Sequence, residues 1–269
     1  TFADKTWAEF RAEHFETAPQ DQAGSNNWAI SGARSGHGGA IVANDMHLPH
    51  RLPNIWYRVR MSWPEGTGRR VVVGVTLPGT PALVVGSNGD VAWGFTNSNG
   101  DWADLIVLEN DPADAESYRT PGGSQPFERH EERIRVNGAD DVVLEVLETT
   151  WGPVFDEDYH GRRRALRWVA HEQAGTNSVL FEMERARSVD EAIEIAARSG
   201  IPGQNFVVAD RDGRIAWTIA GRIPVKRGFD PSLPADWSGA AGWQGWLEPG
   251  RYPRVVNPPS GRIWTANTR

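Results

Sequence analysis

The residue of this chain best placed to act as a nucleophile is Ser25, in the stretch GSNNW at 24–28. A short apolar run that ends in turn residues follows at 29–32, so Ser25 is predicted at the mouth of a buried strand. A serine hydroxyl is a weak nucleophile and needs a base within hydrogen-bond reach. If the bond between Gly24 and Ser25 were cut, the freed α-amine, with a pKa of about 7.7–8.0, would supply that base. The stretch therefore favours an N-terminal nucleophile, with an ordinary polar turn as the alternative.

The sequence changes character at Ser25. Residues 1–24 combine an amphipathic start, with apolar side chains at helix-like spacing, and a polar tail typical of a linker. An Asn-Gly pair at Asn88 lies between two apolar runs and predicts a tight hairpin. Short apolar runs separated by turn residues predict strands at 40–43, 55–61, 71–75, 82–85, 91–95 and 105–108.

The second half of the chain predicts more strands and then helices. Residues 109–165 are predicted to form a peripheral meander of strands. One helix is predicted over about 176–183 and a second over 188–200. The second opens with capping-box spacing between Ser188 and Glu191 and stops at a glycine. Strands followed by covering helices favour a layered α+β domain.

The composition narrows the classes of function. The chain has 269 residues, a formal net charge of −7 and no cysteine. No basic block supports a nucleic-acid or anionic-membrane partner, and no apolar run approaches the roughly 20 residues of a membrane span. Disulfides, thiolate metal ligands and a cysteine nucleophile are excluded, so catalysis would use oxygen, nitrogen or carboxylate groups. The 13 tryptophans predict core packing, with a ligand pocket as the alternative.

The order of several motifs carries a family resemblance. The motifs are GSNNW at 24–28, NDMH at 44–47, WGFTN at 93–97, GDWAD at 100–104 and NPPSG at 257–261, followed by Asn267. From Ser25 to Arg269 the chain closely resembles the penicillin acylase family of N-terminal-nucleophile hydrolases. The resemblance implies part of a four-layer αββα sandwich, of the α+β class. Family members are made as a precursor that cuts itself into an α chain and a β chain. Residues 1–24 would then end the α chain or form a linker, and 25–269 would begin the β chain.

The resemblance also implies the catalytic groups. Ser25 is the nucleophile once the bond after Gly24 has been cut. The backbone N–H of Asn97 and the side-chain amide of Asn267 would stabilise the oxyanion, a task suited to uncharged donors. His47 matches the position where cephalosporin-acylase-like and acyl-homoserine-lactone-acylase-like members carry histidine. It would hydrogen-bond the hydroxyl or the amine of Ser25.

Two further sites follow from the resemblance. Asp101, the carbonyl of Ala103 and Asp104 match a calcium-binding segment, with Pro224 as a further carbonyl ligand; hard oxygen ligands suit a structural calcium ion. The alternative is two solvated aspartates in a loop, and no organic cofactor is implied. The residues expected to line the acyl pocket are mostly apolar, which favours an aromatic or aliphatic acyl group over a glutaryl group. They are Leu48, Ile55, Trp56, Tyr57 and Val85.

The resemblance implies hydrolysis of an N-acyl amide bond in a penicillin, a cephalosporin, an acyl-homoserine lactone or a related compound. The implied partners are the α chain and the rest of the β chain, and the implied location is the periplasm or the outside of the cell. Three alternatives stay open. The chain is an inactive, unprocessed precursor fragment, or a non-catalytic extracellular module whose tryptophans grip a ligand. In the third, Ser25 works in a side-chain triad with His47 and one of the aspartates, Asp101 or Asp104.

Overall fold

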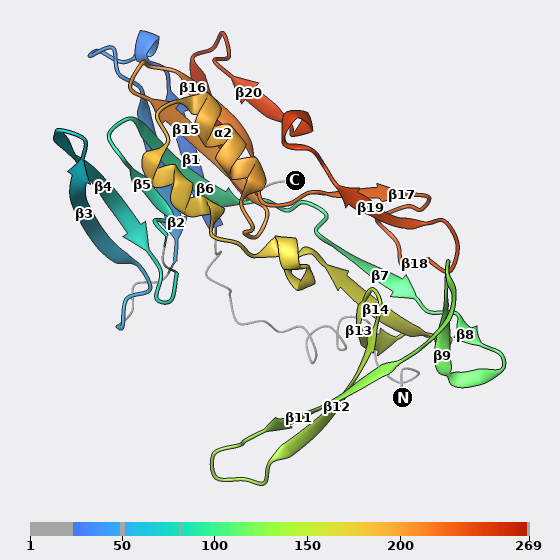
Figure 1. Ribbon diagram of the computed structural model, residues 1–269. Coiled ribbons are helices and arrows are strands. Elements are labelled where there is room, and N and C mark those ends of the chain that lie inside the picture. The colour runs from blue at the N-terminus through green and yellow to red at the C-terminus, as the bar shows by residue number, and fades with distance from the viewer. Residues whose placement is uncertain (1–23, 49–51, 81, 268–269) are drawn as a thin grey trace, which may run out of the picture.

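A seven-stranded antiparallel sheet lies at the centre of the computed structural model, which describes residues 24–48, 52–80 and 82–267 (Figure 1). Its two middle strands are buried along almost their whole length because both faces of the sheet are covered. In spatial order the strands are β20 (Arg254–Val256), β16 (Ile215–Ala220), β15 (Gln204–Asp210), β6 (Val91–Asn97), β5 (Val85–Ser87), β4 (Gly68–Thr76) and β3 (Tyr57–Glu65).

Helix α2 (Val189–Arg198) and the 3-10 helix η4 (Val179–Arg185) cover one face of this sheet (Figure 1). The apolar face of α2 packs with Phe95 and Phe206 of the sheet in one core. The predicted start of α2 is confirmed, because Ser188 Oγ accepts a hydrogen bond from the N–H of Glu191.

The helix predicted over about 176–183 is wrong in type and in its start. The segment is a 3-10 helix that begins only at Val179. Asn177 Oδ1 accepts hydrogen bonds from the N–H groups of Val179 (3.1 Å) and Gly200 (2.8 Å). The side chain of Asn177, which the sequence offers as a cap together with Ser178, therefore ties the start of η4 to the end of α2. Sequence spacing could not reveal this partner, which lies 23 residues away.

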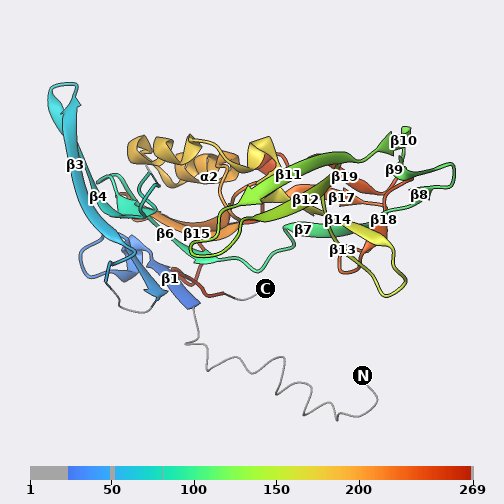
Figure 2. The same ribbon diagram turned by 90° about the horizontal axis from the view of Figure 1, so that it is seen from below.

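A three-stranded antiparallel sheet covers the opposite face of the central sheet. In spatial order it contains β2 (Ile41–His47), β1 (Gly24–Ile30) and β21 (Arg262–Thr265). Along β1, Asn27 and Ala29 are buried while Asn26 and Trp28 are exposed, because successive side chains of a strand point to opposite faces. Ser25 shares the buried face with Asn27. Figure 2 shows β1 and α2 on opposite sides of the central sheet.

Helices, central sheet and three-stranded sheet make three layers. In residues 24–48, 52–80 and 82–267 no helix covers the outer face of the three-stranded sheet, so the fourth predicted layer is not seen there. That outer face carries the cross-strand pair Trp28 and Trp264, which are 39% and 72% exposed. Within the described part of the chain no helix is long and apolar enough to cross a membrane.

The meander predicted at 109–165 is confirmed, and it forms sheets around a second core together with later segments. Trp237 and Tyr118 are nearly fully buried in that core. A six-stranded sheet contains β11 (Glu128–Ile134), β12 (Val142–Thr149), β13 (Gly152–Glu157), β14 (Arg163–Trp168), β7 (Ala103–Val107) and β18 (Ala235–Asp236). Two smaller sheets contain β10 (Gly123–Pro126), β9 (Asp114–Thr120) and β8 (Asn110–Asp111), and β17 (Pro224–Arg227) and β19 (Gly242–Trp246).

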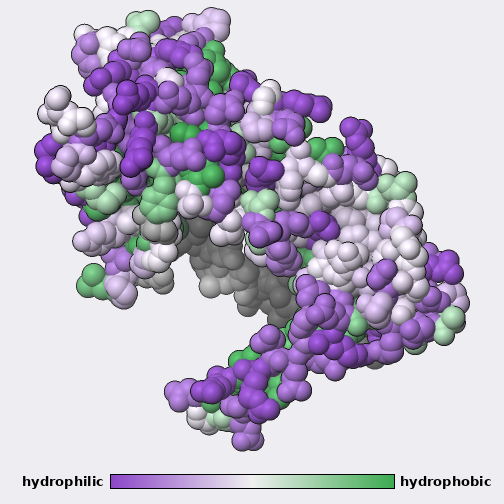
Figure 3. All heavy atoms as spheres, viewed as in Figure 1, coloured by the Kyte–Doolittle hydropathy of each residue, from purple (hydrophilic) through white to green (hydrophobic). Residues whose placement is uncertain are grey.

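The β11–β12 hairpin projects from the rest of the molecule and bears hydrophobic as well as hydrophilic side chains, as Figure 3 shows. Its apolar residues Ile134, Val142, Val143 and Leu144 are each about half exposed. The remaining short elements are the 3-10 turns η1 (Gly32–Arg34), η2 (Val169–His171), η3 (Gln173–Gly175) and η5 (Pro249–Arg251).

Candidate active site

Ser25 is the second residue of β1, so its predicted position at the mouth of a strand is confirmed. Its Oγ donates a hydrogen bond of 2.6 Å to Oδ1 of Asn267. Asn267 follows β21, which pairs with β1 in a register that sets Asn27 opposite Thr265. The pairing of β21 with β1 therefore brings Asn267, the last described residue, next to Ser25.

Side-chain amides connect Asn267 to the end of β6. The carbonyl of Asn267 accepts a hydrogen bond of 2.7 Å from Nδ2 of Asn99. Asn99 Oδ1 in turn lies 3.4 Å from Nδ2 of Asn97, the last and exposed residue of β6. The structure thus brings Ser25, Asn97 and Asn267 into one connected set, although Asn97 lies 72 positions after Ser25 and Asn267 lies 170 positions after Asn97.

Asn205 lies beneath this set and was missed by the sequence reasoning. It is 8% exposed, and its Nδ2 is 3.4 Å from the carbonyl oxygens of both Asn97 and Ala266. Trp217 Nε1 donates a hydrogen bond of 3.0 Å to Asn205 Oδ1, which fixes the orientation of the amide. One buried amide therefore bridges the backbone of both segments that carry the expected oxyanion donors. No local pattern marks Asn205, because its partners lie 108 and 61 positions away.

Asn44 joins the three-stranded sheet to the central sheet. Its Nδ2 donates to the carbonyl of Phe95 on β6 at 2.8 Å and to the carbonyl of Asn26 on β1 at 2.9 Å. Gly94 permits this approach, since a Cβ there would lie 2.8 Å from Asn44 Cβ and 3.0 Å from Asn27 Oδ1. The distance between Ser25 on one sheet and Asn97 on the other is therefore set by close backbone packing.

His47 lies on the face of the three-stranded sheet opposite to Ser25. The register sets Gly24 against His47 and Ser25 against Met46, and directly paired residues share a face. The His47 ring accordingly contacts Asn26 Nδ2 at 3.0 Å and Asp45 Oδ2 at 3.2 Å, whereas the Ser25 hydroxyl is bonded to Asn267. The expected hydrogen bond from His47 to the Ser25 hydroxyl is not formed, and a side-chain triad lacks its base.

The expected calcium segment carries a different cation. Lys226 Nζ lies 2.8 Å from Asp101 Oδ1 and 2.8 Å from Asp104 Oδ2. Within the described chain no cluster of three or more histidine, aspartate or glutamate residues could hold a metal. Calcium binding by Asp101, Ala103 and Asp104 therefore stays a prediction, and the residues present fit it poorly.

The residues expected to line the acyl pocket lie near the ends of β2, β3 and β5. Leu48 follows β2 and Tyr57 opens β3; they are 38% and 66% exposed. Ile55 and Trp56 precede β3, and Val85 opens β5 and packs against the core under the helices. Their role in binding stays a prediction.

A cavity of about 880 Å³ opens next to the amide set. Its lining includes Asn99, which donates a hydrogen bond to the carbonyl of Asn267, and Asn205, which donates one to the carbonyl of Ala266. Other lining residues lie just before β7 or on β16. They include Asp101, Trp102, Trp217 and Ile219. The polar groups beside Ser25 are thus next to an open space of the size of a small-molecule site.

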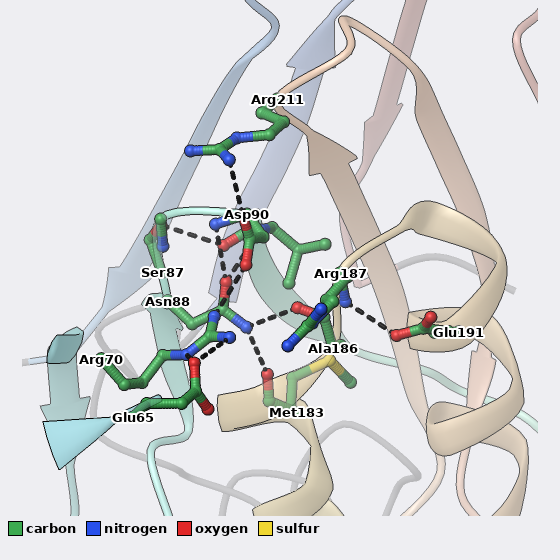
Figure 4. Close-up of polar contacts among 12 residues, drawn as sticks. Glu65, Arg70, Ser87, Asn88, Asp90, Met183, Ala186, Arg187, Glu191 and Arg211 are labelled. Atoms are coloured by element: carbon green, nitrogen blue, oxygen red, sulfur yellow. Dashed lines mark hydrogen bonds and ion pairs between the residues drawn. The ribbon is translucent and has the colours of Figure 1, made fainter. Parts of the chain in front are cut away.

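The start of β6 is fixed by Asn88, the Asn-Gly residue of the confirmed hairpin (Figure 4). Its Nδ2 donates to the carbonyls of Met183 (2.9 Å) and Ala186 (2.7 Å) in the helical layer. Its Oδ1 accepts from the N–H groups of Asp90 (2.8 Å) and Val91 (2.9 Å). The strand that ends at Asn97 is therefore anchored to the helices at its other end.

Arg70 strengthens the same hairpin from the neighbouring strand (Figure 4). The side chain is 7% exposed and pairs with Asp90 and Glu65, each at 2.7 Å. Arg211 reaches the second oxygen of Asp90 at 3.1 Å. The hydrogen bonds to Glu65 and then to Asp90 raise the pKa of Arg70, so this guanidinium stays charged at any ordinary pH.

The chain is similar in sequence to a known protein family and to several of its members. The family model described as penicillin amidase matches residues 2–269. The acyl-homoserine lactone acylase QuiP of Pseudomonas aeruginosa is 30% identical over 262 residues, which cover 92% of this chain and 30% of that protein. The penicillin acylase 2 proenzyme of a Pseudomonas species is 31% identical over 250 residues, 91% of this chain and 32% of that protein.

More distant matches agree. Penicillin G acylase of Escherichia coli is 29% identical over 245 residues, 89% of this chain and 28% of that protein. A solved structure, the thermostable penicillin G acylase of Alcaligenes faecalis, matches with a TM-score of 0.77 at 24% identity over 91% of this chain and 44% of that chain. The structural likeness shows a shared fold. The chain spans about 30% of the length of the curated relatives.

Proposed function

Because the chain belongs to the penicillin amidase family, we propose that it is the nucleophile-bearing part of an enzyme that hydrolyses N-acyl amide bonds, with Ser25 as the nucleophile. The observation that carries the proposal is the 2.6 Å hydrogen bond between Ser25 Oγ and Asn267 Oδ1. It joins a hydroxyl at the end of a rigid strand to an amide of the kind that stabilises an oxyanion.

The first reaction is cleavage of the chain at Ser25. The Ser25 Oγ loses its proton and attacks the carbonyl carbon of Gly24. The C–O bond forms first, and when the C–N bond then breaks, the Ser25 nitrogen takes up the proton that Oγ lost, which leaves an ester and a free Ser25 amine. Water then hydrolyses the ester, releases the Gly24 carboxylate and restores the hydroxyl. His47 lies across from Gly24 in the β1–β2 register, which supports a role beside the amine more than beside the hydroxyl.

In turnover the freed amine acts as the general base. With a pKa of about 7.7–8.0 it accepts the Oγ proton near neutral pH, through a water molecule. Oγ attacks the substrate carbonyl, and the N–H of Asn97 and Nδ2 of Asn267 stabilise the negative oxygen. The amine product leaves with the proton, and water hydrolyses the acyl-enzyme. Asn205 supports this assignment, since it bridges the segments of both donors.

The substrate class is a small N-acyl compound with an aromatic or aliphatic acyl group. The apolar character of Leu48, Ile55, Trp56, Tyr57 and Val85 supports this class, and the names of the relatives refer to penicillin and to acyl-homoserine lactone. The α chain and the rest of the β chain complete the pocket. The exposed pair Trp28 and Trp264 supports a fourth, helical layer over the three-stranded sheet.

A tryptophan-based binding module is less well supported. Trp93 and Trp237 are 1% and 2% exposed, so they pack in the two cores. Trp151 and Trp243 lie against Trp237, with ring centroids 6.2 and 6.5 Å away. These four tryptophans therefore pack in the cores and are not available to grip a ligand.

The test uses the full-length protein that contains this chain. Wild type is expected to release the free amine from penicillin G or from a long-chain acyl-homoserine lactone, and Ser25→Ala is expected to release none. Ser62→Ala, on the distant β3–β4 hairpin, is the matched control and should behave as wild type. Undiminished hydrolysis by Ser25→Ala would contradict the proposal.

A further inference from the structure

Lys226 is held between two carboxylates at the point where the chain passes into its second core. Its side chain is 11% exposed, and that of Asp104 is 3% exposed. Nζ lies 2.8 Å from an oxygen of each carboxylate, Asp101 Oδ1 and Asp104 Oδ2. A lysine with such low exposure in contact with two carboxylates is a built ion cluster, because burying an ammonium without a partner is strongly unfavourable.

Trp243 completes the cluster. Its Nε1 donates a hydrogen bond of 2.5 Å to Asp104 Oδ2, and its ring lies 5.7 Å from Lys226 Nζ. The guanidinium carbon of Arg167 lies 5.0 Å from the centroid of the same ring, and Arg167 pairs with Glu172 at 2.5 Å. The positive charge in contact with Asp104 is therefore that of Lys226.

The local backbone aims Lys226 at the carboxylates. In the pairing of β17 with β19, Pro224 is opposite Trp246 and Lys226 is opposite Trp243, with a register shift between them. Such a shift redirects the side chains that follow it. Lys226 is only two positions after Pro224, the residue whose carbonyl was expected to bind calcium.

A calcium ion does not fit beside this lysine. Calcium takes 6–8 oxygen ligands at 2.3–2.6 Å, and the two carboxylates already form ion pairs with an ammonium 2.8 Å away. A divalent cation between them would lie within a few ångströms of a like charge in a mostly buried place, where repulsion is poorly screened.

We propose that Lys226 is an internal cation that takes the place of calcium between Asp101 and Asp104, so that this region is stable without a metal. Its ammonium neutralises the buried Asp104 and joins the start of β7 to β17. This inference concerns stability and is independent of the proposed hydrolysis, so it can fail or hold whatever the activity of Ser25.

The test measures metal content and thermal stability of the purified full-length protein. Metal analysis is expected to find no stoichiometric calcium, and EDTA or calcium chloride is expected to leave Tm unchanged. Lys226→Met is expected to lower Tm by about 5–10 °C, because it leaves a buried carboxylate without a counter-charge. Arg227→Met removes the same charge from the exposed neighbour on β17 and should change Tm little.

Two results would overturn the inference. The first is bound calcium in the wild type, or a fall in Tm with EDTA; calcium would then be bound through Asp104 Oδ1, which is buried and has no partner in the described part of the chain. The second is a Lys226→Met variant as stable as Arg227→Met. The wild-type measurements decide the question alone if Lys226→Met does not fold.

Discussion

The hydroxyl of Ser25 and the side chain of Asn267 are in direct contact, with Oγ 2.6 Å from Oδ1, although 242 positions separate the two residues. Because Oδ1 accepts this hydrogen bond, the Nδ2 arm of the same amide remains as a donor. A nucleophile and a donor for the negative oxygen are thus held in a fixed relation before a substrate arrives. Such preorganised donors act without reorganisation at the moment of reaction.

Removal of this donor is expected to slow the chemical step. Asn267→Ala in the processed enzyme should lower kcat by about 10²–10³-fold and change KM much less, since an oxyanion donor acts mainly on the transition state. Steady-state kinetics on one N-acyl substrate measures both constants. Asn99→Ala, which removes the contacts to the Asn267 carbonyl and to the Asn97 side chain but leaves the amide of Asn267 in place, should have a much smaller effect. An unchanged kcat in Asn267→Ala would contradict the role assigned to Asn267.

Asn205 is expected to act as a positioning residue. Asn205→Leu keeps the branched shape of the side chain but removes the bridge between Asn97 and Ala266, so kcat should fall about 10-fold with little change in KM. The free energy of unfolding should fall by about 1–3 kcal/mol, because two partly buried carbonyls and the N–H of Trp217 lose a partner.

Trp217→Phe serves as the companion variant, since it keeps an aromatic ring at this position and removes the N–H that orients Asn205. It should shift kcat in the same direction by a smaller factor. A loss of stability in Asn205→Leu with full kcat would show a purely structural role.

The Asn88 contacts predict a large effect on stability far from the chemistry. Asn88→Ala removes hydrogen bonds to two carbonyls of the helical layer and from two backbone N–H groups of the hairpin. Urea unfolding should show a loss of about 3 kcal/mol. Asn137→Ala, at an exposed Asn-Gly turn, should lose less than about 0.5 kcal/mol. Equal losses in the two variants would refute the anchoring role.

Glu184 predicts a pH-dependent effect. Burial raises the pKa of this carboxyl, the charge of Arg185 lowers it by less, and Oε1 has no partner in the described part of the chain. The ionised form therefore costs stability above the folded-state pKa. This cost disappears as the pH falls through that value toward the ordinary pKa of about 4.3. Glu184→Gln should raise Tm at pH 7.5 and lose this advantage at pH 4; a constant difference across this range would contradict the cause.

Local sequence patterns predicted strands, turns and a helix start. They did not predict the contacts between residues far apart in the sequence, which only the structure shows. The mouth of β1, the Asn88 hairpin and the cap at Ser188 follow from neighbouring residues, which act within a few positions. The His47 contact depends on strand register, where a shift of one residue exchanges the two faces.

Some residues of the site were likewise predicted from the sequence, and others were found only in the structure. The order of motifs identified Ser25, Asn97 and Asn267, and the structure joins them through amide contacts. Asn205 and Lys226 were not singled out, because an isolated asparagine or lysine has no spacing that marks it. Each acts through partners more than 60 positions away.

The most direct test of the account is the N-terminal sequence and intact mass of the full-length precursor, compared between wild type and Ser25→Ala. If Ser25 is the N-terminal nucleophile, the wild type gives a new chain that begins at Ser25, with the Gly24 carboxylate at the end of the other piece, and Ser25→Ala gives one uncut chain. An uncut wild type that hydrolyses N-acyl substrates, or cleavage before residue 25 in both proteins, would contradict the claim that Ser25 is the N-terminal nucleophile.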